Sequence, residues 1–267
     1  MEYQRFMPEG WNEDFPMFTT SVLDNAKETG KILQGKVSKC DSNYNLYVDL
    51  GNKITGVIPR EEVEAVNVDE TGFPKPNICI SKVNRFVQFR VKDIDSKNNY
   101  ILSRKEVGKD AINWIREELS EGMIINGIVK SIQPYGAFIE IGGGIVGLLH
   151  IEDISIARIK SPSERLRIGQ KINVVVKCID KKLERVILSY KEMLGNWDEN
   201  IQCFKEGTTV TGIAREIEKF QNGIFVELKP NLVGMAEYID GIQYGQKVDV
   251  YIKKIIPEKK KVKLLIV

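Results

Sequence analysis

Three short stretches of the chain place an aromatic residue two positions before a carboxylate, inside an apolar run. The pairs are Phe138 with Glu140, Tyr47 with Asp49, and Phe225 with Glu227. Side chains of a strand alternate between its two faces, so each pair shares the face opposite the apolar neighbours. If those neighbours form a core, each ring and each carboxylate stands in solvent. A ring exposed on a strand is a surface that can stack on a flat group such as a nucleobase.

The sequence gives little support for a metal site, a catalytic site or a phosphate-binding loop. His150 is the only histidine, so a multi-histidine metal site is excluded and any Ser-His-Asp arrangement would depend on this one residue. The four cysteines are scattered without a Cys-x-x-Cys pair, and the acidic residues show no catalytic clustering. The run 142–144 is all glycine, but no Gly-Lys-Ser/Thr follows it, so a tight turn is favoured over a phosphate cradle. We expect no metal, no cofactor and no enzymatic activity.

The elements that position these residues come in three similar segments. Each segment offers short β-branched runs separated by turn residues, which is typical of a small barrel or sandwich. The middle segment contains five such runs: Ile124–Ile132, Ala137–Ile141, Ile145–Ile151, Lys171–Ile179 and Arg185–Ser189. Five strands of this length suit a five-stranded barrel. The sequence therefore predicts an all-β fold, with short helices only between the barrels.

Two segments between the repeats have helical spacing and a tryptophan each, Trp114 and Trp197. We interpret both as linker helices whose tryptophan anchors a domain joint, in preference to a stacking platform. Residues 1–22 lack periodicity, and either an irregular arm or a docking peptide fits them. The predicted division is an arm at 1–30, repeat one at 31–107, a linker helix at 108–121, repeat two at 122–192, a second linker helix at 193–204, and repeat three at 205–267.

Composition and charge narrow the class of protein. No apolar run approaches the length of about 18 residues that a membrane span needs, and residues 1–10 lack the apolar segment of a secretory signal. We therefore expect a cytoplasmic protein. The net charge is +2, but it is uneven: residues 122–193 carry 11 Lys and Arg against 7 Asp and Glu, whereas residues 1–121 carry 17 against 20. A polyanion is thus expected on the second and third repeats, where residues 205–267 carry 11 against 8.

Four blocks of repeat two carry a family resemblance. They are Gly127-x-Val129, the run Tyr135–Gly142, the run Gly147–Ile151, and the run Arg185–Ser189. In this order and spacing they resemble the S1 RNA-binding domain, a five-stranded barrel of the OB type. The resemblance implies three tandem OB-type S1 barrels, arranged as in a short bacterial ribosomal protein S1.

The family's RNA-binding face implies a set of site residues. Matching motif by motif, repeat two supplies Tyr135, Phe138, His150, Asp180 and Arg185. The two rings would stack on bases, and Arg185, which alternates away from the apolar Val186 and Leu188, would reach a phosphate or a base edge. Asp180 would accept from a base amine or hold Arg185.

The outer repeats depart from this pattern. Repeat three keeps Phe225, but Asn222 replaces the first aromatic, Glu237 replaces the histidine, and Lys261 lies near the arginine position. Repeat one keeps Tyr44 and Tyr47, but Pro59 replaces the histidine, Asn99 lies near the arginine position, and a loop is inserted around residues 71–76. Together with its negative charge, this favours repeat one as a protein-docking barrel, and the resemblance makes the 30S ribosomal subunit its expected partner.

The function predicted from the sequence is therefore non-catalytic binding of single-stranded RNA, such as mRNA, in translation. Repeat two is the expected main binder and repeat three an accessory, in a chain expected to be monomeric. Two alternatives remain: an adaptor whose three barrels all dock to proteins, since OB barrels also bind proteins, and an S1-domain regulator of RNA turnover or transcription.

Overall fold

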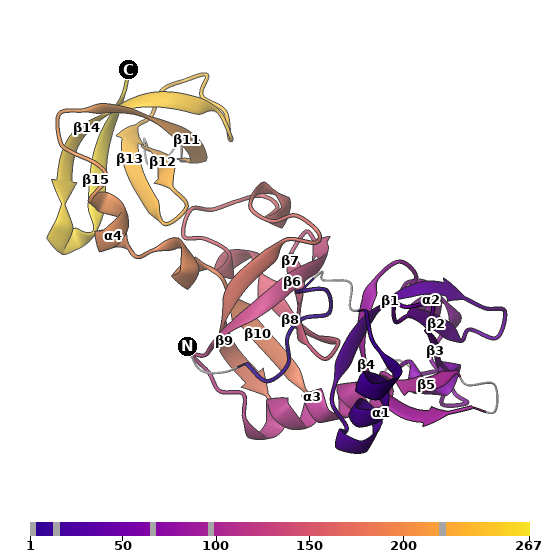
Figure 1. The fold of residues 1–267 in the computed structure, drawn as a ribbon. Coiled ribbons are helices and arrows are strands. Elements are labelled where there is room, and N and C mark those ends of the chain that lie inside the picture. The colour runs from indigo at the N-terminus through magenta and orange to yellow at the C-terminus, as the bar shows by residue number, and fades with distance from the viewer. Residues whose placement is uncertain (1–3, 13–16, 65–67, 96–98, 219–222) are drawn as a thin grey trace. The chain divides into compact units, whose positions relative to one another are not determined.

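The computed structural model describes residues 4–12, 17–64, 68–95, 99–218 and 223–267. Its strands close into three barrels of five strands each (Figure 1). Barrel one contains β1 (Leu33–Cys40), β2 (Leu46–Asp49), β3 (Thr55–Ile58), β4 (Phe86–Ile94) and β5 (Tyr100–Ser103). Barrel two contains β6 (Ile124–Gln133), β7 (Gly136–Gly142), β8 (Ile145–His150), β9 (Lys171–Asp180) and β10 (Arg185–Ser189). Barrel three contains β11 (Thr209–Glu218), β12 (Gly223–Lys229), β13 (Leu232–Glu237), β14 (Lys247–Ile256) and β15 (Lys261–Ile266).

The three barrels share one topology. In each, the first three strands follow one another around the barrel, and the fifth strand lies between the third and the fourth. The third and fifth strands pair in parallel, as in β8 with β10 and β13 with β15, whereas the other pairings for which a register is given are antiparallel. The predicted all-β class and the three five-stranded OB-type barrels are therefore confirmed, and so are the five strands expected in the middle segment.

Alternation explains why these segments become strands. Along β14, Val248, Val250 and Ile252 are buried, and the residues between them face solvent. In the first and third repeats the glycine near the start is needed where the first two strands press together. A Cβ atom on Gly35 would lie 2.6 Å from Val48, and one on Gly212 would lie 2.4 Å from Val226. A larger residue would push the two strands apart at the tightest part of the barrel.

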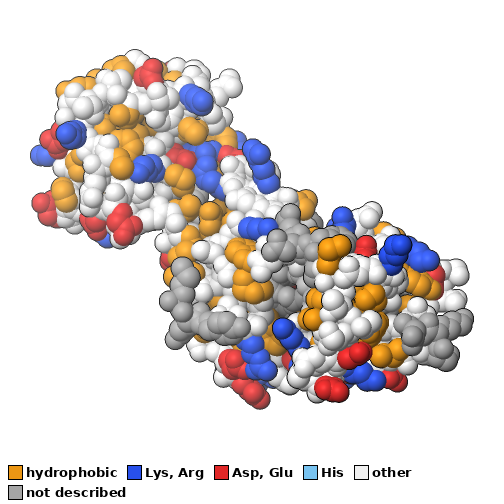
Figure 2. Space-filling view, viewed as in Figure 1, with side chains coloured by type: hydrophobic (Ala, Val, Ile, Leu, Met, Phe, Trp, Pro, Cys, Tyr) orange, Lys and Arg blue, Asp and Glu red, His pale blue; other side chains and the backbone are white. Residues whose placement is uncertain are grey.

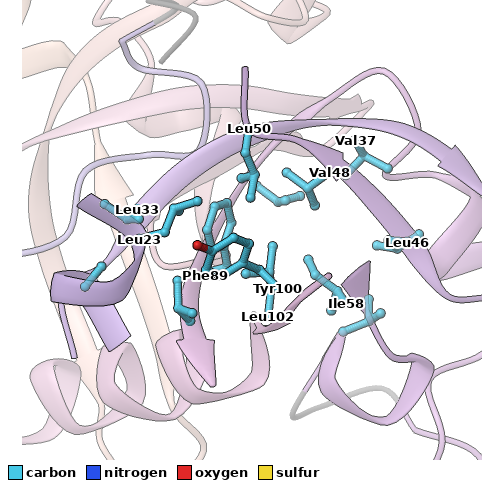
Figure 3. Close-up of a cluster of buried hydrophobic side chains, with 14 of the residues drawn as sticks. Leu23, Leu33, Val37, Leu46, Val48, Leu50, Ile58, Phe89, Tyr100 and Leu102 are labelled. Atoms are coloured by element: carbon cyan, nitrogen blue, oxygen red, sulfur yellow. The ribbon is translucent and has the colours of Figure 1, made fainter. Parts of the chain in front are cut away.

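Helix α1 (Thr20–Thr29) lies within the segment expected to be an arm. Its buried residues Leu23 and Ala26 belong to the core of barrel one (Figure 3). In that view Leu23 lies beside Leu33 and Phe89. The helix was missed because only two of its ten residues are buried, which leaves a weak apolar pattern. A second short helix, α2 (Pro76–Ile80), precedes β4 and buries Cys79 in the same core.

Both expected linker helices exist. Helix α3 (Lys105–Glu117) buries Trp114, whose ring centroid lies 5.8 Å from that of Phe6, and helix α4 (Trp197–Ile201) packs Trp197 into the core of barrel three. Trp197 therefore packs into a barrel as predicted, whereas the ring of Trp114 packs on Phe6 of the first described segment. Five short 3-10 turns complete the described elements: Arg60–Glu62, Ile151–Asp153, Pro162–Glu164, Lys191–Leu194 and Pro257–Lys259.

The first described segment, residues 4–12, is a docked peptide. Phe6 and Glu9 are buried, and the Gln4 side chain donates a hydrogen bond to the Ile141 carbonyl over 2.8 Å. The glycine run 142–144 is the predicted turn between β7 and β8, and all three residues have positive φ. A Cβ atom on Gly142 would lie 2.3 Å from the Phe6 carbonyl oxygen, so the turn leaves room for this segment.

By its packing the chain divides into two compact units. Unit 1 comprises residues 1–128, 139–147 and 179–186, and unit 2 comprises residues 129–138, 148–178 and 187–267. On the face drawn in Figure 2, basic and acidic side chains are interspersed. None of the helices in the described part of the chain is long and apolar enough to cross a membrane.

Candidate nucleic-acid interface

Two aromatic rings meet on the outside of barrel two. Tyr135 stands in the turn between β6 and β7 and is 50% exposed, while Phe138 on β7 is half-buried. Their ring centroids are 6.3 Å apart at an interplanar angle of 88°, which is the edge-to-face arrangement that aromatic pairs favour. Ala137, Ile139 and Ile141 point into the core, so alternation sends Phe138 outward as expected.

Strand β8 completes this surface. The Ile151 N–H donates to the Tyr135 carbonyl over 2.9 Å, and a Cβ atom on Gly136 would lie 3.1 Å from the His150 Cα. His150 therefore stands beside Tyr135, with its side chain 42% exposed. Its Nδ1 accepts a hydrogen bond from the Glu152 N–H over 3.4 Å. This bond orients the ring.

Two aliphatic side chains extend the surface onto β10. Leu148 pairs with Ile187 in the parallel register of β8 and β10, and the next pair, Leu149 with Leu188, is buried in the core. Leu148 and Ile187 therefore face outward, and Ile187 is 37% exposed. We call the outward set the aromatic wall of barrel two: Tyr135, Phe138, Leu148, His150 and Ile187. It is mostly apolar, and each of its side chains is at least partly exposed.

Two lysines are held beside the end of β8 by one buried carboxylate. The Lys177 Nζ lies 2.7 and 2.8 Å from the two carboxylate oxygens of Asp153, and the Lys191 Nζ lies 3.1 Å from Oδ1. Burial raises the pKa of the Asp153 carboxyl, but the hydrogen bonds and charges of the two lysines outweigh it and lower the pKa. Asp153 is therefore an anion that fixes two cations, both of which keep a partly exposed side chain.

These lysines are the residues that the sequence analysis missed. Lys177 alternates away from the buried Val174 and Val176 on β9, so strand parity could have placed it on the outer face. Lys191 follows β10 and offered no such signal. Lys177 lies inside one of the five runs expected to be strands, and Lys191 lies two residues beyond another.

The remaining two predicted residues lie in the hairpin between β9 and β10. The Asp180 carboxylate accepts hydrogen bonds from the Lys182 and Leu183 N–H groups, each over 3.0 Å, so it closes the turn. Arg185 is exposed at the start of β10, and its parity matches that of Ile187, two residues on. The structure thus gives Asp180 a local role in the turn rather than the predicted hold on Arg185.

The expectation that the carboxylates beside the rings stand in solvent is wrong for two of the three. Glu140 is 1% exposed and accepts hydrogen bonds from the Glu9 and Gly144 N–H groups. Glu227 is 5% exposed and pairs with Arg215 and Arg165. In both cases a segment distant in the sequence covers the outer face of the strand and supplies donors. The segments that contact Glu140 and Glu227 therefore cover these parts of the strands and keep a ligand from binding there.

In barrel one, the predicted residues Tyr44 and Tyr47 each contact a basic side chain of the same barrel. The Lys39 Nζ lies 4.2 Å from the ring centroid of Tyr47, and the Arg60 guanidinium lies 5.2 Å from that of Tyr44. Such cation–π contacts occupy one face of each ring. The inserted loop adds Phe73, 5.4 Å from the same guanidinium, while Arg60 also donates to the Pro74 carbonyl. Each tyrosine therefore has one ring face taken by a cation of its own barrel.

Barrel three keeps one ring on the equivalent face. Phe225 on β12 pairs with Met235 on β13, and Met235 is 51% exposed, so an apolar strip faces solvent. Lys261 is exposed at the start of β15, after a turn in which Lys260 has a φ of 48°. Asn222 lies outside the described residues. This barrel therefore offers one platform, with Lys261 and Lys263 exposed on β15, the strand that pairs with β13.

The fold and this surface together define a protein of tandem OB-type barrels. The model of the S1 RNA binding domain family matches residues 26–105 and 118–191. The chain belongs to this family. It is 33% identical over 247 residues to the small ribosomal subunit protein bS1 of Staphylococcus saprophyticus, an alignment that covers 84% of this chain and 62% of that protein.

Two further relatives carry the same name. The bS1 protein of Staphylococcus aureus is 31% identical over 288 residues, covering 95% of this chain and 72% of that protein. The bS1 protein of Neisseria meningitidis serogroup B is 29% identical over 262 residues, covering 91% of this chain and 44% of that protein. The chain thus spans between about half and three quarters of the length of these relatives.

Proposed function

We propose that this chain binds single-stranded RNA without catalysis and acts in translation as a protein of the bS1 type at the small ribosomal subunit. The observation that carries the proposal is the open ring pair of Tyr135 and Phe138 beside His150, with Lys177 and Lys191 held nearby. We place this activity in the cytoplasm, with the chain as a monomer and mRNA as its ligand. The described residues contain no group of three or more His, Cys, Asp or Glu placed to hold a metal ion.

The chemistry of the wall suits an unpaired strand. Stacking on an aromatic ring contributes about 1–3 kcal/mol per base and tolerates any base, because every base has a π-face. The bases of a duplex are already stacked on one another, so few of their faces are available to stack on the rings of the wall. Arg185 and the two lysines would contact phosphates, which adds affinity without sequence preference. The protein should therefore bind single strands with slight base preference.

Barrel three acts as an accessory site in this proposal. Its single platform, Phe225, and the nearby Lys261 would bind weakly alone. Once barrel two holds the strand, binding to barrel three becomes intramolecular, and the effective concentration raises the overall affinity.

Barrel one is proposed to dock the protein to the 30S subunit. Its ring faces are partly taken by Lys39 and Arg60, and the residues up to 121 carry a net negative charge, which disfavours RNA. These same observations support the adaptor alternative, in which all three barrels bind proteins. A pull-down of ribosomal proteins that survives nuclease treatment, with no measurable affinity for oligo(U), would favour that alternative.

Filter binding of oligo(U) tests the proposal. The variant Phe138→Ala/Arg185→Ala removes one ring and one cation of the proposed face, and should bind at least about tenfold more weakly. A matched control is Phe73→Ala/Arg85→Ala, which removes the same residue types from barrel one, where both are exposed. Equal affinity of the wild type and the first variant, with both folded, would contradict the proposed face.

A further inference from the structure

The segment between β8 and β9 is fixed to barrel three within unit 2. The Ala157 N–H donates to the Pro230 carbonyl over 2.9 Å, and the Ile156 N–H donates to Asn231 Oδ1 over 3.1 Å. Asn231 is buried and also donates to the Lys191 carbonyl over 2.6 Å. A buried side chain that links three backbone segments holds them in one arrangement.

Charged groups reinforce the same joint. Arg215 and Glu227 of barrel three are buried, and they form ion pairs with Glu164 and Arg165 respectively, both of the β8–β9 segment. The Tyr244 hydroxyl donates to Glu164 over 2.9 Å and accepts from the Lys160 N–H over 2.9 Å. Surfaces that lie between barrel two and barrel three in this unit are therefore preformed.

Two grooves lie along this joint. The first, of about 590 Å³, is lined by Ile151, Ile156 and Lys191 among others, and Ile151 directly follows His150 of the aromatic wall in the sequence. The second, of about 450 Å³, is lined by Lys160, Arg215 and Tyr244 among others. Arg158 and Ile159 line both grooves, and we call the two grooves together the track. Its lining residues come mainly from the chain directly after His150 and from barrel three.

The side chains of the track suit a strand with an anionic backbone. Arg158 is 77% exposed, Lys191 is partly exposed, and the Lys160 Nζ lies 4.2 Å from the ring centroid of Tyr244. Two acids also line it: Glu152, which is exposed, and Glu216, which pairs with Arg158. Arg215 also lines the second groove, but it is buried and paired with Glu164 and Glu227, which leaves three cations against these two acids. Ile156, 57% exposed, adds an apolar surface on which a base can rest.

We propose that single-stranded RNA leaving the aromatic wall of barrel two continues along this track, with phosphates at Lys191, Arg158 and Lys160. The inference rests on the proposed function, because the wall supplies the bound strand. RNA is the occupant we favour over an acidic peptide, because the first groove is lined by Ile151, the residue after His150 of the wall, and the accessible cations of the track outnumber its acids. The track would lengthen the site beyond barrel two.

Fluorescence anisotropy with two lengths of oligo(U) tests this proposal. A strand of about 5 nucleotides is expected to cover the wall alone, and one of about 15 nucleotides to reach the track, given site sizes of about 4–16 nucleotides per OB barrel. Arg158→Ala should weaken binding of the long strand about 3- to 10-fold and leave the short strand unchanged. The slope of log affinity against log salt for the long strand should fall by about 0.7, the value expected when the protein neutralises one phosphate fewer.

Two matched variants separate a phosphate contact from a structural role. Arg167→Ala removes an exposed arginine of the same segment outside both grooves and should bind both strands as wild type. Glu216→Gln breaks the ion pair of Arg158 without removing its charge, so it should bind the long strand at least as tightly as wild type. Loss of affinity in Glu216→Gln equal to that in Arg158→Ala would overturn the phosphate contact.

The outcomes also distinguish this proposal from the function it rests on. If Phe138→Ala binds both strands with the affinity of the wild type, the proposal that the aromatic wall binds RNA is refuted. If Phe138→Ala weakens the binding of both strands, but Arg158→Ala weakens the binding of neither or of both equally, the proposal that the wall binds RNA is supported and the proposal of the track is refuted. A further outcome would also overturn the track: an acidic peptide binds the wild type but not Arg158→Ala, while the two proteins bind RNA with equal affinity.

Discussion

Barrel one and barrel two have the same topology, but they use their outer surfaces differently. In barrel one, Glu9 of the docked peptide forms a buried ion pair with Arg104, and its carboxylate also accepts from the Gln88 N–H of β4. The rings of Tyr44 and Tyr47 lie under cations of the same barrel. In barrel two, the rings of Tyr135 and Phe138 contact each other and face solvent.

The difference teaches that an aromatic at the family's binding position does not by itself make a platform. The side chains around it decide whether a ring face is open. Pro59 takes the place of the histidine in barrel one, whereas His150 completes the wall of barrel two. Under the proposed function, one barrel contacts protein, including its own chain, and the other binds a strand of bases.

The largest expected effect concerns the stability of barrel one. Arg104 is 2% exposed and pairs with Glu9 and Glu64, so Arg104→Ala leaves a buried carboxylate without its cation. Removing one partner of a buried pair costs about 3–5 kcal/mol. Urea unfolding should show this loss, whereas Arg85→Ala, at an exposed arginine, should change the free energy of unfolding little. RNA affinity of the folded Arg104 variant should stay at the wild-type value.

Acid should act through the same ion pair. Burial raises the pKa of the Glu9 carboxyl, but Arg104, with help from Lys82 and the Gln88 N–H, outweighs it and lowers the pKa to about 2. Since the folded pKa lies below the unfolded one, the stabilisation is present above about pH 4.5 and is lost as the pH falls toward 2. Glu9→Gln should therefore flatten the dependence of unfolding free energy on pH across this window. An unchanged slope would refute this assignment.

Matched substitutions of one ring compare the two walls directly. Phe138 and Tyr47 occupy equivalent positions on β7 and β2. Phe138→Ala should weaken oligo(U) binding about 5- to 150-fold, corresponding to about 1–3 kcal/mol for the stacking of one base. Tyr47→Ala should change it less than about twofold on the same scale. Isothermal titration calorimetry measures both, and similar losses in the two variants would remove the distinction between the barrels.

The smallest expected effect is on salt dependence. Arg185 is exposed on the strand that carries Ile187 of the wall, so its contact with a phosphate is screened by water and salt. Arg185→Ala should reduce the slope of log affinity against log salt by about 0.7 and weaken binding severalfold at low salt. A titration at several salt concentrations gives the slope. If the slope stays unchanged, Arg185 makes no phosphate contact.

Much of the fold was predictable because alternation is strong in these strands. The five strands of barrel two agree with the expected runs to within one or two residues, and Phe138 faces outward because Ala137 and Ile139 are core residues. Tyr135 and His150 came from the family resemblance, and Leu148 and Ile187 were not predicted as part of the wall.

The contacts between segments that are distant in the sequence could not be predicted. Glu140 is buried because the N–H of Glu9, 131 residues away, docks on it, and Glu227 because Arg165, 62 residues away, reaches it. Local alternation carries no information on such partners. The same holds for Lys191, whose place near the wall depends on Asp153, 38 residues earlier.

The most direct test of the open wall is photocrosslinking of 4-thiouridine RNA to the full chain, with the attached residues identified by mass spectrometry. The account predicts crosslinks at Tyr135, Phe138 or His150 of barrel two, and none at Tyr44 or Tyr47 of barrel one. Crosslinks on the tyrosines of barrel one, with the wall of barrel two unmarked, would contradict it.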